Sequence, residues 1–306
     1  LAVLSGAAGC AVPGVAHQAS ARTAVHAARV SDARQHPAAA AASCNPDASS
    51  LAPSGPPSVS SGSFAAKIRA RGYLIVGVDQ STYHFGFLNP IDNKIEGFDI
   101  DMVDAVAQAI FGSGYQSHID FKAIPDSDRI SDLRSGAVDI VAHTMTITCD
   151  RLQQIDFSSV YYDAQEELLV LKNSAASGMQ DLKGQQVCAT YGSDDVATIQ
   201  RYHAIPVQVT YWTDCLVDLQ QGQVVGISTD DSILHGLTAQ DPFTKIVGGP
   251  LQPEPYGLGI SKQHPDFVRF VNAVLAQLRS DGQWQADYRQ WVGSPAPAPP
   301  SAQYAS

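Results

Sequence analysis

The chain has few basic residues for its length and no long apolar run. Its 306 residues include 19 Lys or Arg and 30 Asp or Glu, which gives a formal net charge of −11 at pH 7. Nucleic acids and anionic membrane surfaces are polyanions, so this charge argues against both as partners. No window approaches the roughly 20 consecutive apolar residues of a membrane-spanning helix. The chain is therefore not expected to cross a bilayer.

Cysteine and histidine are also sparse, and their spacing does not suggest metal ligands. No CxxC pair occurs, and His17, His26 and His36 lie too far apart to form a metal cage. No Ser-His-Asp spacing stands out either. The sequence therefore predicts neither a metal site nor a cofactor. Its apolar content of 44% and its length are compatible with two globular domains.

The first ten residues, LAVLSGAAGC, contain no Met and resemble the end of a secretory signal. Ala7 to Cys10 resembles a bacterial lipobox, with Ala where Leu is commoner, which implies that Cys10 is lipidated and becomes the new N-terminus. A plain signal peptide with an incidental cysteine is the alternative. Residues 10–63 are rich in Ala, Ser, Pro and Gly, which predicts a disordered tether after a signal peptide that ends at residue 9.

From Phe64 onward, short apolar runs alternate with helical patterns. The runs at 74–78, 119–123 and 138–142 are too short for helices and are expected to form strands, and the first and last runs are typical of buried strands. Asp99 is expected to cap the helix between the first two of these runs. A second α/β unit follows within residues 166–255. The repeated β-α-β order predicts an α/β fold with mostly parallel sheets.

Residues 143–162, HTMTITCDRLQQIDFSSVYY, carry the clearest binding pattern. Thr146 and Thr148 stand where a strand ends and a helix begins, so their hydroxyls and the free N–H groups of the first turn favour an anion. Arg151 lies one turn into that helix and can bond a carboxylate at two points. This arrangement suits the α-carboxylate of a free amino acid. A solvated arginine beside two helix-capping threonines is the alternative.

This segment resembles a signature of extracytoplasmic solute-binding proteins for polar amino acids (family 3), the receptor subunits of ABC importers. The signature T-I-T-x-x-R-x-x-x-x-D-F-S-x-x-Y is matched by Thr146, Ile147, Thr148, Arg151, Asp156, Phe157, Ser158 and Tyr161. Further matches follow the family's order: LIVGVD at 74–79, EGFDIDMVDAVA at 96–107 and DGQWQADYRQW at 281–291. Over residues 64–292 the chain is thus similar to this family, including actinobacterial glutamate- and glutamine-binding lipoproteins.

The resemblance implies a two-lobed, periplasmic-binding-protein-like fold of type II with a hinge between the lobes. Lobe 1 would comprise residues 64–165 and 256–292, and lobe 2 residues 166–255. Two connections between lobes allow closure around a ligand. The Pro-rich residues 293–306 are expected to be a disordered tail. We expect a monomer that contacts the membrane only through its N-terminal lipid, outside the cytoplasm.

The resemblance also assigns ligand contacts. Arg151 and Thr146 would bind the α-carboxylate, and Asp230 the α-ammonium group. Arg129 matches an arginine that binds side-chain carboxylates in the acidic-amino-acid branch, although Asp126 replaces that branch's serine. The alternatives are that Asp230 only caps a helix and that Arg129 is an exposed arginine paired with Asp132.

Further pocket residues are expected at strand and helix ends. Ser193 falls on a family position whose hydroxyl faces the ligand, but Asp194 and Asp195 depart from that pattern, and one of them could instead cap the helix. Asp79 follows the first strand of lobe 1. Ligands of open α/β sheets bind beyond such strand ends, so Asp79 and two aromatic residues of the next loop, Tyr83 and Phe85, are candidate pocket walls. Ordinary loop packing is the alternative for the aromatic residues.

With Cys10 as the lipid anchor, four cysteines remain in a chain that is expected to be exported. Four cysteines allow three pairings. Cys188 ends a strand and Cys215 opens a helix of the same predicted lobe, so we expect these two to be bonded. Cys44 and Cys149 would then form the second bond. Free buried thiols are the alternative.

The resemblance implies a receptor that binds a free polar amino acid and delivers it to an ABC permease. The arginine at position 129 favours glutamate or aspartate as ligand, with asparagine and glutamine next. A sensor subunit that feeds a membrane signalling partner is the alternative. A dehydratase on the same fold is a third possibility, and Asp79, His143 and the pair Asp230 and Asp231 are its only candidate acid–base groups. We do not expect an enzyme.

Overall fold

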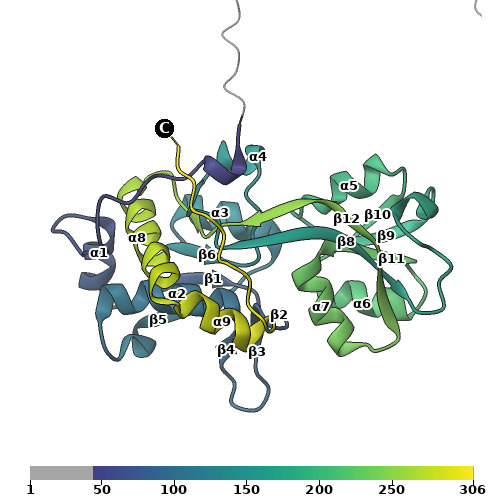
Figure 1. Ribbon diagram of the computed structural model, residues 1–306, viewed down its shortest axis with the longest axis horizontal. Helices are drawn as coiled ribbons and strands as arrows, with labels where there is room; N and C mark the ends of the chain where they lie inside the picture. Colours follow the sequence, from purple (N-terminus) through teal and green to yellow (C-terminus); the bar gives the residue numbers. More distant parts are fainter. Residues whose placement is uncertain (1–43, 306) are drawn as a thin grey trace, which may run out of the picture. The chain divides into compact units, whose positions relative to one another are not determined.

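The computed structural model describes residues 44–305. The predicted signal peptide, the lipidation site Cys10 and residues 10–43 of the predicted tether lie outside the described residues. Figure 1 shows two groups of helices and strands joined by two long strands, β8 (Tyr162–Leu171) and β12 (Thr244–Tyr256). Each group is built on its own five-stranded sheet. We call the group that contains β1 lobe 1 and the other group lobe 2.

Lobe 1 contains a five-stranded sheet in the order β5-β1-β6-β13-β7. Its strands are β1 (Leu74–Val78), β5 (Ile119–Ala123), β6 (Ile140–Ala142), β7 (Asp156–Phe157) and β13 (Gly259–Ile260). Strand β1 is parallel to its neighbours β5 and β6, as the sequence predicts, whereas the short β13 is antiparallel to both of its neighbours. A smaller sheet holds β2 (Ser81–Thr82), β3 (Gly86–Leu88) and β4 (Ile95–Glu96).

The helices of lobe 1 surround these sheets. They are α1 (Phe64–Arg71), α2 (Phe98–Phe111), α3 (Arg129–Ser135), α4 (Cys149–Leu152), α8 (Pro265–Asp281) and α9 (Gln283–Trp291), with short 3-10 turns η1 (Pro46–Ala48), η2 (Tyr115–His118) and η3 (Asp126–Asp128). The core between α2, α8, α9 and the sheet is aromatic, because Phe98 contacts Tyr161, Trp284 and Tyr288 edge-on or tilted. Among residues 44–305, no helix is both long and apolar enough to cross a membrane.

Lobe 2 contains the sheet β10-β9-β11-β8-β12. Its remaining strands are β9 (Gln186–Thr190), β10 (Ile205–Val209) and β11 (Gly226–Asp230), and its helices are α5 (Asp195–Arg201), α6 (Trp212–Gln220) and α7 (Asp231–Gln240), with the 3-10 turn η4 (Met179–Leu182). Strands β9, β10 and β11 are parallel, whereas β8 is antiparallel to β11 and β12. The chain thus enters lobe 2 on β8 and leaves it on β12.

The prediction that Asp99 caps α2 is wrong. Gly97 occupies the N-cap position, with a φ of 137° that favours glycine, and Asp99 lies inside the first turn. The buried Asp99 carboxylate accepts hydrogen bonds from the Tyr161 hydroxyl at 2.6 Å and from the Thr144 N–H at 2.7 Å. Asp99 therefore links α2 to two segments that are distant in sequence, which a local capping pattern cannot reveal.

The prediction of a disordered tether is wrong for residues 44–63, which pack on lobe 1. The Ser50 hydroxyl donates to the Phe157 carbonyl at 2.7 Å, and the buried Asn272 amide of α8 donates to both Ser50 Oγ and the Leu51 carbonyl. Leu51 and Val59 pack against the lobe 1 core. A buried amide needs hydrogen-bond partners, and this segment supplies them.

The C-terminal segment also differs from the expected disordered tail. Tyr304 forms a parallel bridge with Ser50, and the Ala305 N–H donates to the Ser50 carbonyl at 2.8 Å. The composition of residues 293–305 lacks a core-forming pattern. Backbone hydrogen bonding to the N-terminal segment nevertheless places this end of the chain on lobe 1.

Candidate functional site

A small pocket lies where lobe 1 and lobe 2 meet. It is lined by Asp126, Arg129, Thr144, Thr146, Arg151, Ser193, Asp194, Asp195, Trp212, Thr229, Asp230 and Ile233. Its volume is about 10 Å³, which is roughly the room that one water molecule needs. The side chains of the pocket therefore fill the space that they enclose, and a larger ligand requires them to move apart.

Arg151 is held at the centre of this pocket by short-range contacts. It lies in the four-residue helix α4, where the Thr148 hydroxyl at the N-cap accepts a hydrogen bond from the Arg151 N–H at 3.2 Å. Its guanidinium donates to the Thr146 carbonyl at 2.7 Å and, across the cleft, to the Gly192 carbonyl at 3.1 Å. The same Nη2 atom lies 3.0 Å from Oδ1 of Asp194 in lobe 2. Arg151 thus joins the two lobes.

The charge of Arg151 is stabilised by surrounding acids. Burial by itself would lower the pKa of Arg151, but Asp194, Asp126, Glu254 and Asp195 outweigh it and raise that pKa above its ordinary value. The guanidinium is therefore a permanent cation in a buried position. Such a group is suited to a ligand carboxylate, provided that the ligand displaces Asp194.

Gly192 allows the lobes to approach closely at this point. Its φ is +87°, and a Cβ atom added there would lie 2.8 Å from the Ser127 Cα atom of lobe 1. Both the backbone conformation and the close contact exclude a larger residue. The glycine therefore lets its carbonyl reach Arg151 and Arg129.

Arg129 is already paired with a carboxylate of its own lobe. Its Nη1 atom lies 2.9 Å from Oδ1 of Asp126, and it donates to the carbonyls of Asp126 and His143, both at 3.1 Å. Oδ2 of Asp126 accepts a hydrogen bond from the Thr190 hydroxyl of lobe 2. Burial favours a higher pKa for Asp126, but Arg129, His143 and other neighbours outweigh it, and the pKa of Asp126 is lowered. The pair is therefore ionised and its charges balance.

Arg129 is not the exposed surface arginine of the alternative interpretation, because it is only 3% exposed. His143 also points into the pair: its Nδ1 atom lies 3.3 Å from Oδ1 of Asp126, and its Nε2 atom lies 2.9 Å from the Ile124 carbonyl. In the sequence, Asp126 stands out only because it departs from the family pattern. Its role as the partner of Arg129 is a tertiary contact.

Asp230 lies at the end of β11, in the N-cap position of α7, but its side chain makes no capping hydrogen bond. One of its oxygens accepts a hydrogen bond from the Tyr256 hydroxyl, which also shares a hydrogen bond with Ser232. Burial, followed by nearby carboxylates, raises the pKa of Asp230 well above its ordinary value. A cation beside Asp230 would restore its negative charge, and an α-ammonium group has the required sign.

The loop around Ser193 borders the pocket from lobe 2. The Ser193 hydroxyl is buried and has no hydrogen-bond partner among the described residues. Asp194 occupies the N-cap position of α5 without a side-chain capping bond, and its carboxylate contacts Arg151 instead. This loop therefore offers one free hydroxyl and one carboxylate to the cleft.

Three predicted pocket residues do not line the pocket. Asp79 is held by its own turn, where its carboxylate accepts from the Ser81 N–H and hydroxyl and from the Thr82 hydroxyl. Phe85 is buried in the lobe 1 core against Tyr162 and other aromatic rings. Tyr83 is 40% exposed and packs on His84 and Phe87, and its backbone faces Gly236 of α7. Ligands of open α/β sheets bind beyond strand ends, and the loop after β1 does lie near the lobe interface. The side chains of Asp79, Tyr83 and Phe85, however, do not line the pocket.

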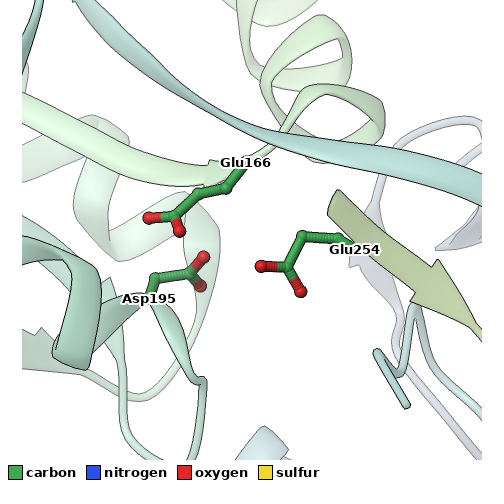
Figure 2. Close-up of side chains that lie close together, drawn as sticks. All are labelled: Glu166, Asp195 and Glu254. Carbon is green, nitrogen blue, oxygen red and sulfur yellow. The ribbon is translucent and has the colours of Figure 1, made fainter. Parts of the chain in front are cut away.

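A group of acidic side chains beside the pocket was not predicted. Glu166 on β8, Glu254 on β12 and Asp195 at the start of α5 are buried, and Figure 2 shows their carboxyl groups turned toward one another. Burial raises the pKa of Glu166 to about 7 and that of Glu254 to about 10, and it raises the pKa of Asp195 well above its ordinary value. Glu166 and Glu254 belong to no local sequence motif, so the acidic cluster becomes visible only when the fold brings these side chains together.

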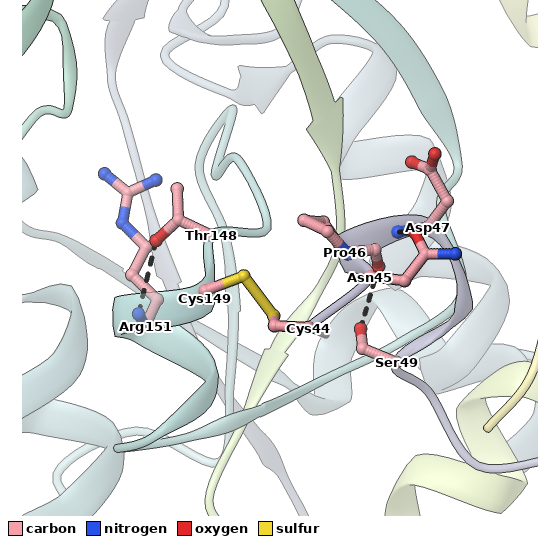
Figure 3. Close-up of a disulfide and its surroundings, with 8 residues drawn as sticks. All are labelled: Cys44, Asn45, Pro46, Asp47, Ser49, Thr148, Cys149 and Arg151. Atoms are coloured by element: carbon pink, nitrogen blue, oxygen red, sulfur yellow. Dashed lines mark hydrogen bonds between the residues drawn. A yellow bond between two sulfur atoms is a disulfide. The ribbon is translucent and has the colours of Figure 1, made fainter. Parts of the chain in front are cut away.

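Both predicted disulfide bonds are present. Cys188 is bonded to Cys215 within lobe 2, and Cys44 is bonded to Cys149. Figure 3 shows the second bond beside Thr148 and Arg151, since Cys149 is the first residue of α4. The disulfide therefore ties the N-terminal segment to the short helix that carries the central arginine.

A larger hollow of about 600 Å³ lies on lobe 1, between α2, α8 and α9. Its charged lining consists of acidic residues, namely Asp101, Asp104, Asp281 and Asp287, and contains no Lys or Arg. It has no group that could bind a ligand carboxylate. The small interlobe pocket, which has two arginines, is therefore the better candidate site.

Comparison with known proteins identifies the family and the relatives of this chain. A family model described as bacterial extracellular solute-binding proteins, family 3, matches residues 74–294. The ABC transporter glutamine-binding protein GlnH of Bacillus subtilis is 33% identical over 74% of this chain and 84% of that protein. The glutamate-binding protein GluB of Corynebacterium glutamicum is 29% identical over 72% of this chain and 79% of that protein.

Solved structures show the same architecture. An ancestral arginine-binding protein bound to glutamine matches with a TM-score of 0.68 and 30% identity, over 73% of this chain and 99% of that chain. A mutant of ArgBP from T. maritima matches with a TM-score of 0.69 and 26% identity, over 74% and 98% of the two chains. These matches confirm the two-lobed, type II periplasmic-binding-protein-like fold that the sequence predicts. The chain belongs to the bacterial extracellular solute-binding proteins of family 3.

Proposed function

We propose that this protein captures a free polar amino acid between its lobes and delivers it to the permease of an ABC importer. Arg151 binds the α-carboxylate, with help from Thr146 and the Ser193 hydroxyl, and Asp230 binds the α-ammonium group. The observation that carries the proposal is the position of Arg151, buried in the interlobe pocket and opposite the partly exposed carboxylate of Asp194. The named relatives that bind glutamine, glutamate or arginine support the same class of ligand.

The charge of the pocket favours an uncharged or cationic side chain over an acidic one. Two arginines line the pocket, but so do four aspartates, at positions 126, 194, 195 and 230. Arg129, to which the sequence analysis assigned a side-chain carboxylate, already neutralises Asp126. An additional carboxylate would lose its hydration in a site whose two arginines are already paired with Asp126 and Asp194. We therefore propose glutamine or arginine as ligand, in place of the glutamate that the sequence favoured.

The proposed location is outside the cytoplasmic membrane, where the lipidated Cys10 would hold the receptor near its permease. Residues 10–43 would link that anchor to the Cys44–Cys149 bond. We propose that the receptor acts as a monomer and performs no catalysis.

Metabolic labelling with a radioactive fatty acid tests the lipid anchor at Cys10, and a Cys10→Ser variant should lose the label.

Calorimetry of the ligand-stripped protein against the twenty amino acids tests the ligand class. We expect glutamine or arginine to bind at least about tenfold more tightly than glutamate and aspartate, which equals about 1.4 kcal/mol. Tightest binding of glutamate would reject the charge argument. If none of the amino acids binds to the stripped protein, the proposed receptor function is wrong.

A further inference from the structure

The buried carboxylates of Glu166, Asp195 and Glu254 lie close together in one cluster. One oxygen from each lies within 4.8 Å of the others, and the side chains converge from two interlobe strands and the start of α5 (Figure 2). Glu166 and Glu254 are fully buried and Asp195 is 3% exposed. We call these residues the carboxylate trio. It lies beside the amino-acid pocket, because Asp195 belongs to both.

Each glutamate of the trio uses only one oxygen in a hydrogen bond. Oε1 of Glu166 accepts from the Ser228 hydroxyl at 2.7 Å, and Oε1 of Glu254 accepts from the Gln252 amide at 2.6 Å. The buried atoms Oε2 of Glu166, Oδ1 of Asp195 and Oε2 of Glu254 have no hydrogen-bond partner among the described residues. Buried polar atoms are normally paired, so three unpaired carboxylate oxygens in one place indicate a missing partner.

The missing partner is not a basic side chain of the described chain. Within residues 44–305, the nearest pocket arginines pair with Asp126 and Asp194, and no ion pair involves the trio. Buried carboxylates that face one another need a positive charge to remain ionised, because burial and mutual repulsion both disfavour their anions. A cation that enters the cluster would supply this charge.

The type of cation follows from the donor atoms and their separation. All donors are carboxylate oxygens, which suit hard cations, whereas zinc prefers nitrogen and sulfur. Calcium binds oxygens at about 2.4 Å, so oxygens that share one calcium ion lie at most about 4.8 Å apart. Magnesium usually keeps several bound waters and takes only one or two protein carboxylates, which fits a buried group of three carboxylates less well. We propose that Glu166, Asp195 and Glu254 bind a calcium ion.

A calcium ion at the trio would act on the interlobe connection. Glu166 lies on β8 and Glu254 on β12, the two strands that join the lobes, and both residues lie on the same side of the register shift in the pairing of these strands. Bonds from both strands and from α5 to one ion would fix their relative positions. The ion would also balance negative charge next to the pocket without occupying Arg151. Calcium would therefore stabilise the fold even when no amino acid is present.

Calcium binding can be tested on the full chain after treatment with a chelator. Calorimetry at neutral pH should detect one calcium ion per chain, and saturating calcium should raise the melting temperature by about 3 °C or more, since a ligand of the native state stabilises it. Magnesium should have a smaller effect. Glu166→Gln and Asp195→Asn should weaken calcium binding at least about tenfold. The control Glu167→Gln changes the next residue on β8, which faces away from the trio and is partly exposed, and it should bind calcium normally.

Several outcomes would overturn this assignment. Absence of calcium binding to the native chain would do so, as would binding that survives both Glu166→Gln and Asp195→Asn. Each variant must melt cooperatively in the absence of calcium, and we expect it to be at least as stable as the metal-free native chain because repulsion is reduced. If free arginine, and not calcium, stabilises the protein in a way that depends on Glu166, the trio belongs to the amino-acid site. Arg151→Ala should abolish amino-acid binding but retain calcium binding, which separates the two proposals.

Discussion

Nη2 of Arg151 in lobe 1 lies 3.0 Å from Oδ1 of Asp194 in lobe 2. A carboxylate of the protein itself therefore occupies the position that the proposed function gives to the α-carboxylate of the ligand. Asp194 can hold the lobes together without a ligand, and an incoming amino acid has to displace it. Because an internal ion pair and a ligand compete for one guanidinium, the strength of this pair should lower the apparent affinity for ligand.

Arg151→Ala should abolish amino-acid binding. A desolvated carboxylate that loses its charged partner is destabilised by about 3 to 5 kcal/mol, and Arg151→Lys should bind nearly as poorly because it loses the two-point contact. Calorimetry with the preferred ligand measures the loss. Arg134→Ala, which removes an exposed arginine of α3, is the matched control and should bind normally. A loss of less than about tenfold for Arg151→Ala would remove this arginine from the site.

Asp194→Asn should strengthen ligand binding. The neutral amide competes less well for Arg151, and we expect an affinity gain of about fivefold or more, which corresponds to about 1 kcal/mol. Asp128→Asn, at an exposed residue near the lobe interface, should have no effect. Weaker binding by Asp194→Asn in the same titration would mean that Asp194 contacts the ligand directly and does not compete with it.

Asp126→Asn should shift the ligand preference toward glutamate. This change leaves the charge of Arg129 unbalanced, so an acidic side chain gains a partner that an amide side chain does not need. We expect the ratio of glutamate affinity to glutamine affinity to rise about tenfold, or about 1.4 kcal/mol. Competition between the two amino acids measures this ratio directly. An unchanged ratio would show that Arg129 does not reach the side-chain pocket.

Removal of the Cys44–Cys149 bond should affect binding more than removal of the Cys188–Cys215 bond. A four-residue helix is not stable by itself, and the first bond fixes α4, which carries Arg151. The double Cys→Ala variant of each pair should lose stability by roughly 3 to 5 kcal/mol, since both bonds restrict the unfolded chain. Calorimetry should show a fall in affinity of about tenfold for the first variant only. Equal losses of affinity would mean that the bond at α4 has no special effect on the arginine.

The stability of the fold should increase when the pH falls from about 8 to about 5, and Asp101 should cause part of this increase. Burial raises the pKa of Asp101 to about 7. Nearby acids add to this increase, and the hydrogen bond from Trp291 opposes it. In this pH range the folded chain holds a proton that the unfolded chain releases, so acid favours folding. Asp101→Asn should reduce the pH-dependent increase by at least about 1 kcal/mol. Denaturant titrations at both pH values measure it.

A residual pH dependence should persist in Asp101→Asn. Burial also raises the pKa of Asp104, to about 6, and this carboxyl group remains in the variant. Its contribution has the same sign and should disappear in the double variant with Asp104→Asn. An identical pH profile for the native chain and Asp101→Asn would contradict the assignment to Asp101.

Much of the fold follows from local sequence patterns. Helix α1 ends at Gly72, because glycine tolerates the left-handed conformation that terminates the helix. The runs at 74–78, 119–123 and 138–142 became β1, β5 and β6. Strands β1 and β6 are largely buried, whereas the edge strand β5 has no buried residue. The arginine motif placed Arg151 correctly in the first turn of a helix with Thr148 as its cap. These features depend on residues within a few positions of one another.

The chemistry of the cleft depended instead on contacts between distant segments. The sequence by itself determined the family, the order of the strands and helices, the pairing of the cysteines and the arginine at the centre of the pocket. Only the tertiary structure decided that Asp126 neutralises Arg129, that Asp194 pairs with Arg151, and that Glu166, Asp195 and Glu254 converge. The physical reason is that propensities and caps act locally along the chain, whereas the strength of a charge interaction depends on distance and burial, which exist only after the lobes have folded.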